Sequence, residues 1–170
     1  ALAQRPLAIK TPTLVVNDVI KALAALAAEF RRRYAGARWI GITGSSGKTT
    51  VKELIAAACR STGAVVHATR GNHNNHIGVP LTILATPIGV RYAVIEMGAN
   101  HCGEIAELAA MARPEIGVVT GIGPAHLEGF GGITGVATGK SELFAALPPG
   151  ATVLVGLHGI VANAVSCGST

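Results

Sequence analysis

Short apolar runs alternate with helix-length segments along most of this chain of 170 residues. The runs that we expect to form strands are residues 39–42, 64–68, 91–97, 116–120 and 151–155. The expected helices are the segment after residue 47 up to about 61, and residues 79–85, 103–112 and about 134–147. This alternation predicts an α/β fold, a parallel sheet with helices on both faces. In such a sheet, ligands bind beyond the carboxyl ends of the strands.

The composition supports one well-packed domain without a membrane segment. Hydrophobic residues make up 49% of the chain and charged residues 14%, whereas aromatic residues are only 4%. Ala, Val, Ile and Leu must therefore fill the core. No apolar run approaches the ~20 residues that span a bilayer, and no signal peptide is visible. The 3 cysteines are scattered and form no Cys-x-x-Cys motif, so we expect a cytoplasmic protein in a reducing compartment.

The net charge favours small anionic ligands over nucleic acid. The formal charge of +5 comes from 14 basic and 9 acidic residues. Part of it is the cluster Arg31-Arg32-Arg33 at the end of an expected helix, where cations complement the helix dipole. A nucleic-acid surface would need a long basic stripe or interleaved aromatic residues, and neither is present.

The first part of the chain predicts a connector and one helix. Residues 1–16 contain Pro6 and Pro12, which favour irregular structure. Asn17 and Asp18 can cap a helix that continues to about Tyr34. Its expected apolar stripe consists of Val19, Ile20, Leu23, Leu26 and Phe30.

The segment between the first sheet strand and its helix has the chemistry of a nucleotide-phosphate loop. It reads Thr43, Gly44, Ser45, Ser46, Gly47, Lys48, Thr49, Thr50. Small residues let backbone N–H groups point at phosphate oxygens, Lys48 adds a positive charge, and the Thr49 hydroxyl can bind Mg²⁺. Ile42 stands where a standard P-loop has its first glycine, so this is a shorter form. The alternative is an ordinary Gly/Ser turn from strand to helix.

Glu96 ends an apolar run, where a buried carboxylate needs a partner. Beside a nucleotide loop, this position favours a Mg²⁺ ligand. The alternative is a salt-bridged glutamate at a strand end.

Further polar residues follow other expected strands. His126 lies in the loop after residues 116–120, opposite Glu96, which favours a metal or phosphate role over a structural one. Lys140 lies on an expected helix, where a lysine is by default solvated. Two Asn-rich segments could bind a ligand or form turns, and the sequence leaves both open. Their candidate residues are Asn72, Asn74, Asn75, Asn100 and His101.

Taken together, these segments resemble the Mur ligase family. The resemblance is carried, in order, by residues 43–53, 71–80, 93–101, 104–106, 125–131 and 140–144. It implies a P-loop NTPase-like central domain that is incomplete in this chain. Residues 1–37 would then be a connector and helix from a preceding domain, residues 38–156 the ATP-binding part, and residues 157–170 an unassigned tail.

The resemblance also implies an ATP-dependent ligation of a carboxylate to an amine. Among family members, the pattern is most similar to the one that adds D-alanyl-D-alanine to a UDP-linked muramoyl tripeptide through an acyl phosphate. By position, the residues from Gly44 to Thr50 match those that hold ATP. Thr49, Glu96 and His126 match Mg²⁺ ligands, and Lys140 matches a carbamylated lysine that supports a second Mg²⁺. Asn74 and Asn75 match the loop associated with the UDP-linked substrate.

Other readings stay open. The chain could come from a sister ligase, including one that adds glutamate to folate. It could also be a P-loop nucleotide-binding module without ligase chemistry, or a poorly folded truncation with an exposed sheet edge. The chain has no initiator Met, and we expect the amine-binding part to lie beyond Thr170, so this segment alone would not complete a ligation.

Overall fold

The computed structural model describes residues 1–34 and 36–156, so the unassigned tail predicted at 157–170 lies outside it. The elements are β1 Leu2–Ala3, β2 Leu14–Val15, α1 Val19–Arg33, β3 Arg38–Thr43, α2 Lys48–Ser61, β4 Val66–Ala68, α3 Gly78–Leu84, β5 Tyr92–Glu96, α4 Glu104–Ala112, β6 Ile116–Val119, α5 Leu127–Phe130, α6 Ile133–Ala145 and β7 Thr152–Val155.

The main sheet has the strand order β4-β5-β3-β6-β7, and every neighbouring pair is parallel. This confirms the predicted α/β fold with a parallel sheet. In the register, Ile42 of β3 lies beside Glu96 of β5 and beside Val118 of β6. The carboxyl ends of the three central strands therefore lie together at one edge of the sheet.

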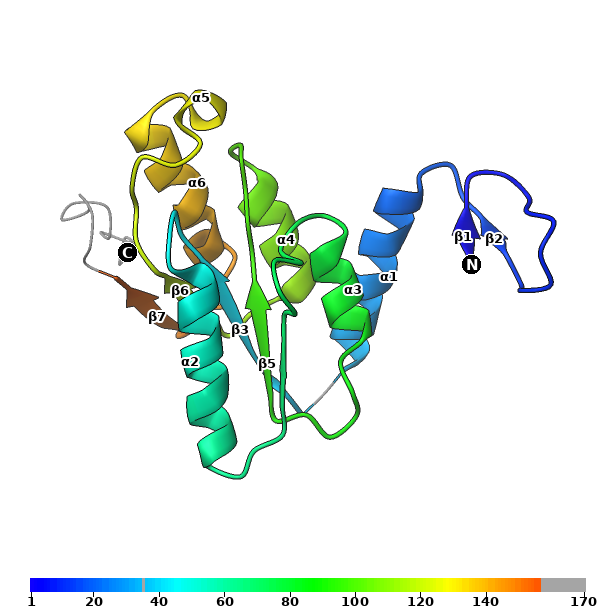
Figure 1. Ribbon diagram of the computed structural model, residues 1–170, viewed down its shortest axis with the longest axis horizontal. Coiled ribbons are helices and arrows are strands. Elements are labelled where there is room, and N and C mark those ends of the chain that lie inside the picture. The colour runs from blue at the N-terminus through cyan, green and yellow to red at the C-terminus, as the bar shows by residue number, and fades with distance from the viewer. Residues whose placement is uncertain (35, 157–170) are drawn as a thin grey trace.

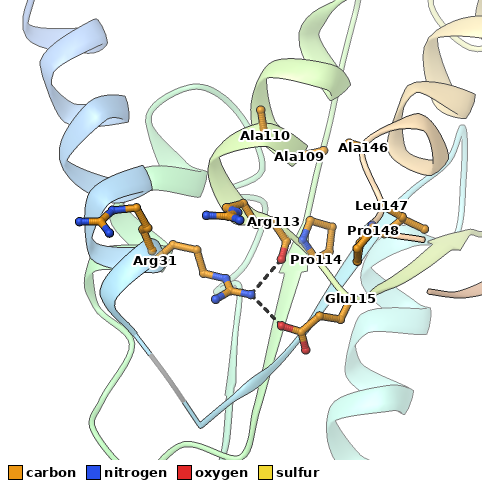
Figure 2. Close-up of a pocket in the computed structure, with 10 residues that line it drawn as sticks. Arg31, Ala109, Ala110, Arg113, Pro114, Glu115, Ala146, Leu147 and Pro148 are labelled. Atoms are coloured by element: carbon orange, nitrogen blue, oxygen red, sulfur yellow. Dashed lines mark hydrogen bonds and ion pairs between the residues drawn. The ribbon is translucent and has the colours of Figure 1, made fainter. Parts of the chain in front are cut away.

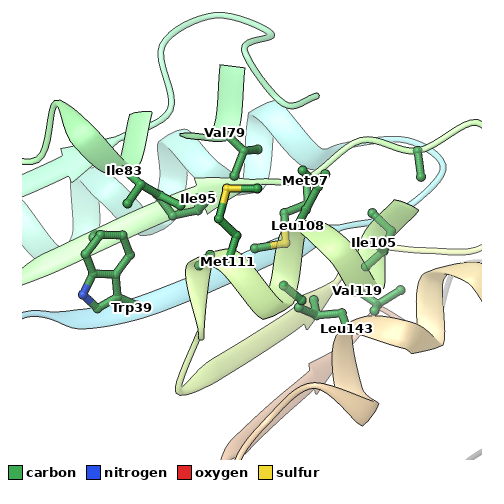
Figure 3. Close-up of a cluster of buried hydrophobic side chains, with 14 of the residues drawn as sticks. Trp39, Val79, Ile83, Ile95, Met97, Ile105, Leu108, Met111, Val119 and Leu143 are labelled. Carbon is green, nitrogen blue, oxygen red and sulfur yellow. The ribbon is translucent and has the colours of Figure 1, made fainter. Parts of the chain in front are cut away.

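Helices cover both faces of this sheet, but unequally (Figure 1). One face carries α2, whose Val51 and Ile55 pack on buried β-branched residues of the central strands. The other face carries α3, α4 and α6 and encloses the larger core, which contains Trp39, Met97 and Leu143 (Figure 3). Since successive side chains of a strand point to opposite faces, neighbours in β3 such as Trp39 and Ile40 belong to different cores.

Helix α1 packs outside α3 and α4. Asp18 caps it as predicted, accepting a hydrogen bond from Lys21 N at 3.0 Å. The predicted apolar stripe is partly wrong, because Ile20 and Leu26 are exposed while Ala27 is fully buried in the larger core. Close helix packing at this surface selects the small alanine side chains instead.

Two further expectations need correction. Residues 1–16 are not entirely irregular, because β1 and β2 form a short parallel pair with Leu2 beside Leu14. Figure 1 shows this pair at the opposite end of the molecule from β7. The loop expected after residues 116–120 contains the short helix α5. None of the helices in the described ranges has the length and apolar character needed to cross a bilayer.

Candidate functional site

The phosphate loop is held in place by the loop that follows β6. Ser45 N donates to Gly121 O at 2.9 Å, and the Ser45 hydroxyl both donates to Gly123 O and accepts from Gly123 N. A Cβ atom on Gly44 would lie 2.2 Å from Thr120 Oγ1, so only glycine allows this close approach. Gly47, directly before α2, has φ +76°, a backbone conformation that glycine adopts readily.

The N-terminus of α2 is suited to an anion. Among the described residues, no side chain caps it, so its first N–H groups remain available to a ligand. Lys48 Nζ folds over the loop and donates to Gly44 O at 2.8 Å. Burial lowers the pKa of Lys48, and the negative charge of Glu96 opposes that shift only in part.

Glu96 lies at the centre of a polar cluster behind the phosphate loop. Its side chain is only 1% exposed. The Thr49 hydroxyl donates to it, 3.2 and 3.0 Å from its two oxygens, and Asn74 Nδ2 donates to Oε1 at 2.9 Å. The backbone N–H of Glu96 donates to Thr69 Oγ1, which fixes the strand end. Thr49, Asn74 and Glu96, which are distant in the sequence, thus form one unit.

A cavity of about 410 Å³ opens in front of this cluster. It collects predicted residues from the phosphate loop, both Asn-rich segments, the loop after β6 and helix α6. Its lining is Gly44, Lys48, Asn74, Asn75, His76, Gly98, Ala99, Asn100, Glu104, His126 and Lys140.

Lys140 is buried, in contrast to the default for a helix lysine. It is 2% exposed, donates to Ala99 O at 3.2 Å and lies over the ring of Phe130. Burial, reinforced by the positive charge of Lys48, lowers the pKa of Lys140 to about 8. The neutral and hence nucleophilic form is still the minor one at pH 7, but it is far more populated than in a lysine with the ordinary pKa.

His126 has an unusual backbone conformation. Its φ of 57° is one of two positive values among the non-glycine residues that the structure describes. Such a conformation persists where the surroundings enforce it, and it is enriched at functional sites. Here it directs the chain from the loop after β6 into α5, beside the cavity.

Several predicted residues do not line the cavity. Asn72 is exposed, and its backbone oxygen accepts from Asn74 N. His101 is largely exposed and contacts Glu104. Ser46 of the phosphate loop and Thr50 in the first turn of α2 are also exposed. The lining also leaves out Ser45, Gly47, Thr49 and Glu96. Asn75, in contrast, lines the cavity, and its Oδ1 accepts from the N–H groups of residues 77 and 78.

Four lining residues were not predicted: Gly98, Ala99 and two with titratable side chains, His76 and Glu104. His76 lies 3.9 Å from Glu104, which also accepts hydrogen bonds from Asn100 N and His101 N. The available signal was the position of Glu104 in the first turn of an expected helix at the ligand-binding edge. A carboxylate there complements the helix dipole, although it also orders the adjacent loop.

The residues present fit Mg²⁺ in part. The Thr49 hydroxyl and the Glu96 carboxylate are the oxygen ligands that this hard cation prefers, whereas the His126 imidazole is not. Within residues 1–34 and 36–156, no three His, Cys, Asp or Glu side chains converge as a metal-binding group. A cation here would therefore rely on Thr49, Glu96, water and the phosphates of a bound nucleotide.

A larger cavity of about 630 Å³ lies elsewhere, between the end of α1, the end of α4 and the end of α6. Figure 2 shows that Arg31 points across it toward Glu115 and the backbone oxygen of Arg113. Glu115 precedes β6, so this cavity lies at the amino ends of the strands, away from the phosphate loop. Although this cavity is the larger of the two, none of the predicted site residues lines it, so we do not assign the functional site to it.

Comparison with known proteins places this geometry in a family. The Mur ligase middle domain matches residues 42–163. UDP-N-acetylmuramoyl-tripeptide–D-alanyl-D-alanine ligase of Escherichia coli K12 is 49% identical over 147 residues, which are 86% of this chain and 32% of that protein.

Solved structures give the same result. A crystal structure of MurF from Acinetobacter baumannii matches with a TM-score of 0.85 and 39% identity, covering 93% of this chain and 35% of that one. MurF from Thermotoga maritima, solved in complex with ADP, matches with a TM-score of 0.81 and 33% identity over 91% and 36% of the two chains. The chain thus spans about a third of the length of these relatives. By its sequence, fold and phosphate loop, it belongs to the Mur ligase middle-domain family.

Proposed function

We propose that this chain forms the phosphate- and cation-binding part of an ATP-dependent ligase that joins D-alanyl-D-alanine to a UDP-N-acetylmuramoyl tripeptide. The observation that carries the proposal is the arrangement at one sheet edge. The N-terminus of α2, which no side chain of the described residues caps, adjoins the Thr49–Glu96 cluster. Lys48 and Lys140 line one cavity. The identity of the two proposed substrates comes from the names of the relatives.

On the ATP side, the backbone of residues 44–50 would hold the phosphates, with Lys48 at the group that is transferred. Thr49 and Glu96 would hold Mg²⁺, which neutralises phosphate charge when it is bound. Lys48 now donates to the loop carbonyl of Gly44, so nucleotide binding would redirect its ammonium toward a phosphate oxygen. The MurF relative from Thermotoga maritima binds ADP, which supports a nucleotide here.

The ligation then needs two displacements. A carboxylate oxygen of the tripeptide attacks the γ-phosphorus of ATP and ADP leaves. The amine of D-alanyl-D-alanine next attacks the acyl carbon and phosphate leaves. Both steps bring anionic groups together, so cationic side chains must stabilise the charge that develops.

Residues around the cavity would serve these steps in different ways. Lys48 supplies a cation to the transferred group. Asn74 and Asn100, which line the cavity together with His126, would orient the peptide carboxylate and neighbouring amides. A carbamylated Lys140 would present an anion to a second Mg²⁺. Because these substrates are nucleotide-linked precursors, we place the reaction in the cytoplasm.

A chimeric enzyme tests the ligase proposal. The Escherichia coli ligase would carry this chain in place of its own matching segment, and phosphate release dependent on D-alanyl-D-alanine would be measured. We expect turnover, and we expect its loss when Lys48 is changed to Ala in the same chimera. A folded chimera that binds ADP but does not turn over would instead favour a nucleotide-binding module without ligase chemistry.

Nucleotide binding is tested separately on the protein itself. We expect Mg·ADP at about 100 times its Kd to raise the Tm by roughly 5–10 °C, because binding to the folded state adds about 2.7 kcal/mol. Lys48→Ala should abolish most of this shift. The exposed Lys10 provides the matched control, since Lys10→Ala should leave the shift unchanged. A wild-type protein that does not respond would contradict the phosphate-loop assignment.

A further inference from the structure

A buried lysine lies behind the proposed cation site. Lys52 is on α2, four residues after Lys48 and three after Thr49, so the three side chains share one face of the helix. Its side chain is 1% exposed, although lysine is rarely fully buried without a partner. Its role was not predicted from the sequence, where it resembles any helix lysine.

Three acceptors surround the Lys52 ammonium. Nζ lies 3.1 Å from Glu53 Oε1, 3.3 Å from Gly71 O and 3.8 Å from Glu96 Oε2. The shortest of these contacts is not the most important. Glu53 is 58% exposed, so water screens its charge, whereas Glu96 is as buried as Lys52 itself.

The side chains that donate hydrogen bonds directly to the Glu96 carboxylate are neutral. These donors are Thr49 and Asn74. Lys48, which lines the cavity, interacts with the negative charge of Glu96 electrostatically. Lys48 is also the residue that nucleotide binding would draw away. Lys52 is therefore the cation that stays with Glu96 whether or not a nucleotide is present.

We propose that Lys52 is a positioning residue for the cation site. Its ammonium is the fixed counter-charge of Glu96, orients that carboxylate toward Thr49, and weakens the attraction of the site for a divalent cation. This inference rests on the proposed Mg²⁺ site at Thr49 and Glu96. Its consequence is a site that binds Mg²⁺ weakly without a nucleotide and takes it up mainly together with the phosphates.

Lys52→Met tests the charge while keeping the length of the side chain. In the whole purified protein without metal, we expect the Tm to fall by about 10 °C, because an unpaired buried carboxylate remains. In a titration with MgCl₂ alone, followed by Tm, we expect the Mg²⁺ dissociation constant to decrease by about tenfold, as expected for the loss of one nearby positive charge. Lys21→Met, on the exposed side of α1, is the matched control and should change neither value.

A double variant separates charge pairing from packing. If Lys52 pairs with Glu96, then Lys52→Met combined with Glu96→Gln should recover at least half of the Tm that Lys52→Met loses. This comparison still decides when the single variant does not fold, since pairing requires the double variant to fold. No recovery would overturn the proposal and make Lys52 a packing residue.

The Mg²⁺ titration tests the role of Lys52 separately from the existence of the cation site. Equal Mg²⁺ affinity in wild type and Lys52→Met would overturn the role of Lys52 and leave the cation site intact. A Tm that does not respond to MgCl₂ in either protein, up to the highest concentration tested, would overturn the cation site and with it the role of Lys52. Glu53→Gln should have little effect in any of these measurements, because that carboxylate is screened by water.

Discussion

At the scale of single residues, Lys140 shows how the fold changes the chemistry of a side chain. The helix that carries it predicts a solvated lysine, yet the ammonium lies between the backbone oxygen of Ala99 and the ring of Phe130. Burial disfavours the charged form, and the cation of Lys48 adds to this effect. A neutral amine is the form that reacts with CO₂, so the environment favours the carbamylation implied by the family resemblance.

The lowered pKa of Lys140 predicts how stability depends on pH. In the folded state the amine loses its proton near pH 8, whereas the unfolded chain keeps it up to about 10.5. Between these values the unfolded state binds more protons, so the free energy of unfolding should rise with pH, by at most about 3 kcal/mol. Lys140→Met should remove this rise. Denaturant melts of both proteins from pH 7.5 to 10 measure it, and equal slopes would contradict the assignment.

At the scale of elements, α4 is fixed at both ends by side chains from other helices. Glu142 of α6 accepts from Gly103 N and Ala106 N at its start. Arg31 of α1 donates to the backbone oxygens of Ala112 and Arg113 at its end. Since Glu104, the first residue of α4, itself lines the cavity, these contacts hold a helix that borders the site.

Arg31 should therefore contribute strongly to stability. We expect Arg31→Ala to lower the free energy of unfolding by about 2–4 kcal/mol, because it leaves helix-end carbonyls and Glu115 without their partner. Arg31→Lys should recover less than half of the loss, since one ammonium cannot replace the planar guanidinium. The control is Arg33→Ala, whose side chain is 74% exposed, with an expected change within about 0.5 kcal/mol. Equal effects at both positions in denaturant melts would contradict this role.

The elements themselves were largely predictable, because their hydrophobic periodicity and caps are local. The exceptions have nonlocal causes. The core-facing side of α1 is set by alanines that allow close packing on α3 and α4, and not by its largest apolar residues. The short helix α5 depends on the left-handed backbone of His126 before it. Neither effect is visible in a window of sequence.

At the scale of the whole molecule, the edge of the sheet that carries the site was predictable from the strand–helix alternation. The contacts within the site were not. Lys52 and Asn74 both reach Glu96 from different elements, and only the strand order brings those elements together. The predicted division at residue 37 stays a prediction, while α1 itself contributes Ala27 to the larger core.

Two deletions test where the folded unit begins. Removing residues 1–16 takes away β1 and β2 but leaves Asp18 to cap α1, so we expect the Tm to fall by no more than about 5 °C. Removing residues 1–34 uncovers the core at Trp39 and deletes Arg31, so cooperative unfolding should be lost. Thermal melts followed by Trp39 fluorescence compare the two. A cooperative melt in the longer deletion would place α1 outside the folded unit.

The central position of β3 also has a consequence for the order of events during folding. Its two partners, β5 and β6, are both made later than β3 itself. The phosphate loop is fixed only once residues 120–123 are available to hold Ser45. At a synthesis rate of about 5–20 residues/s, roughly 4–14 s separate the emergence of the loop from that of its anchors. Nascent chains should thus acquire affinity for nucleotide late, and nucleotide cannot guide the first stages of folding.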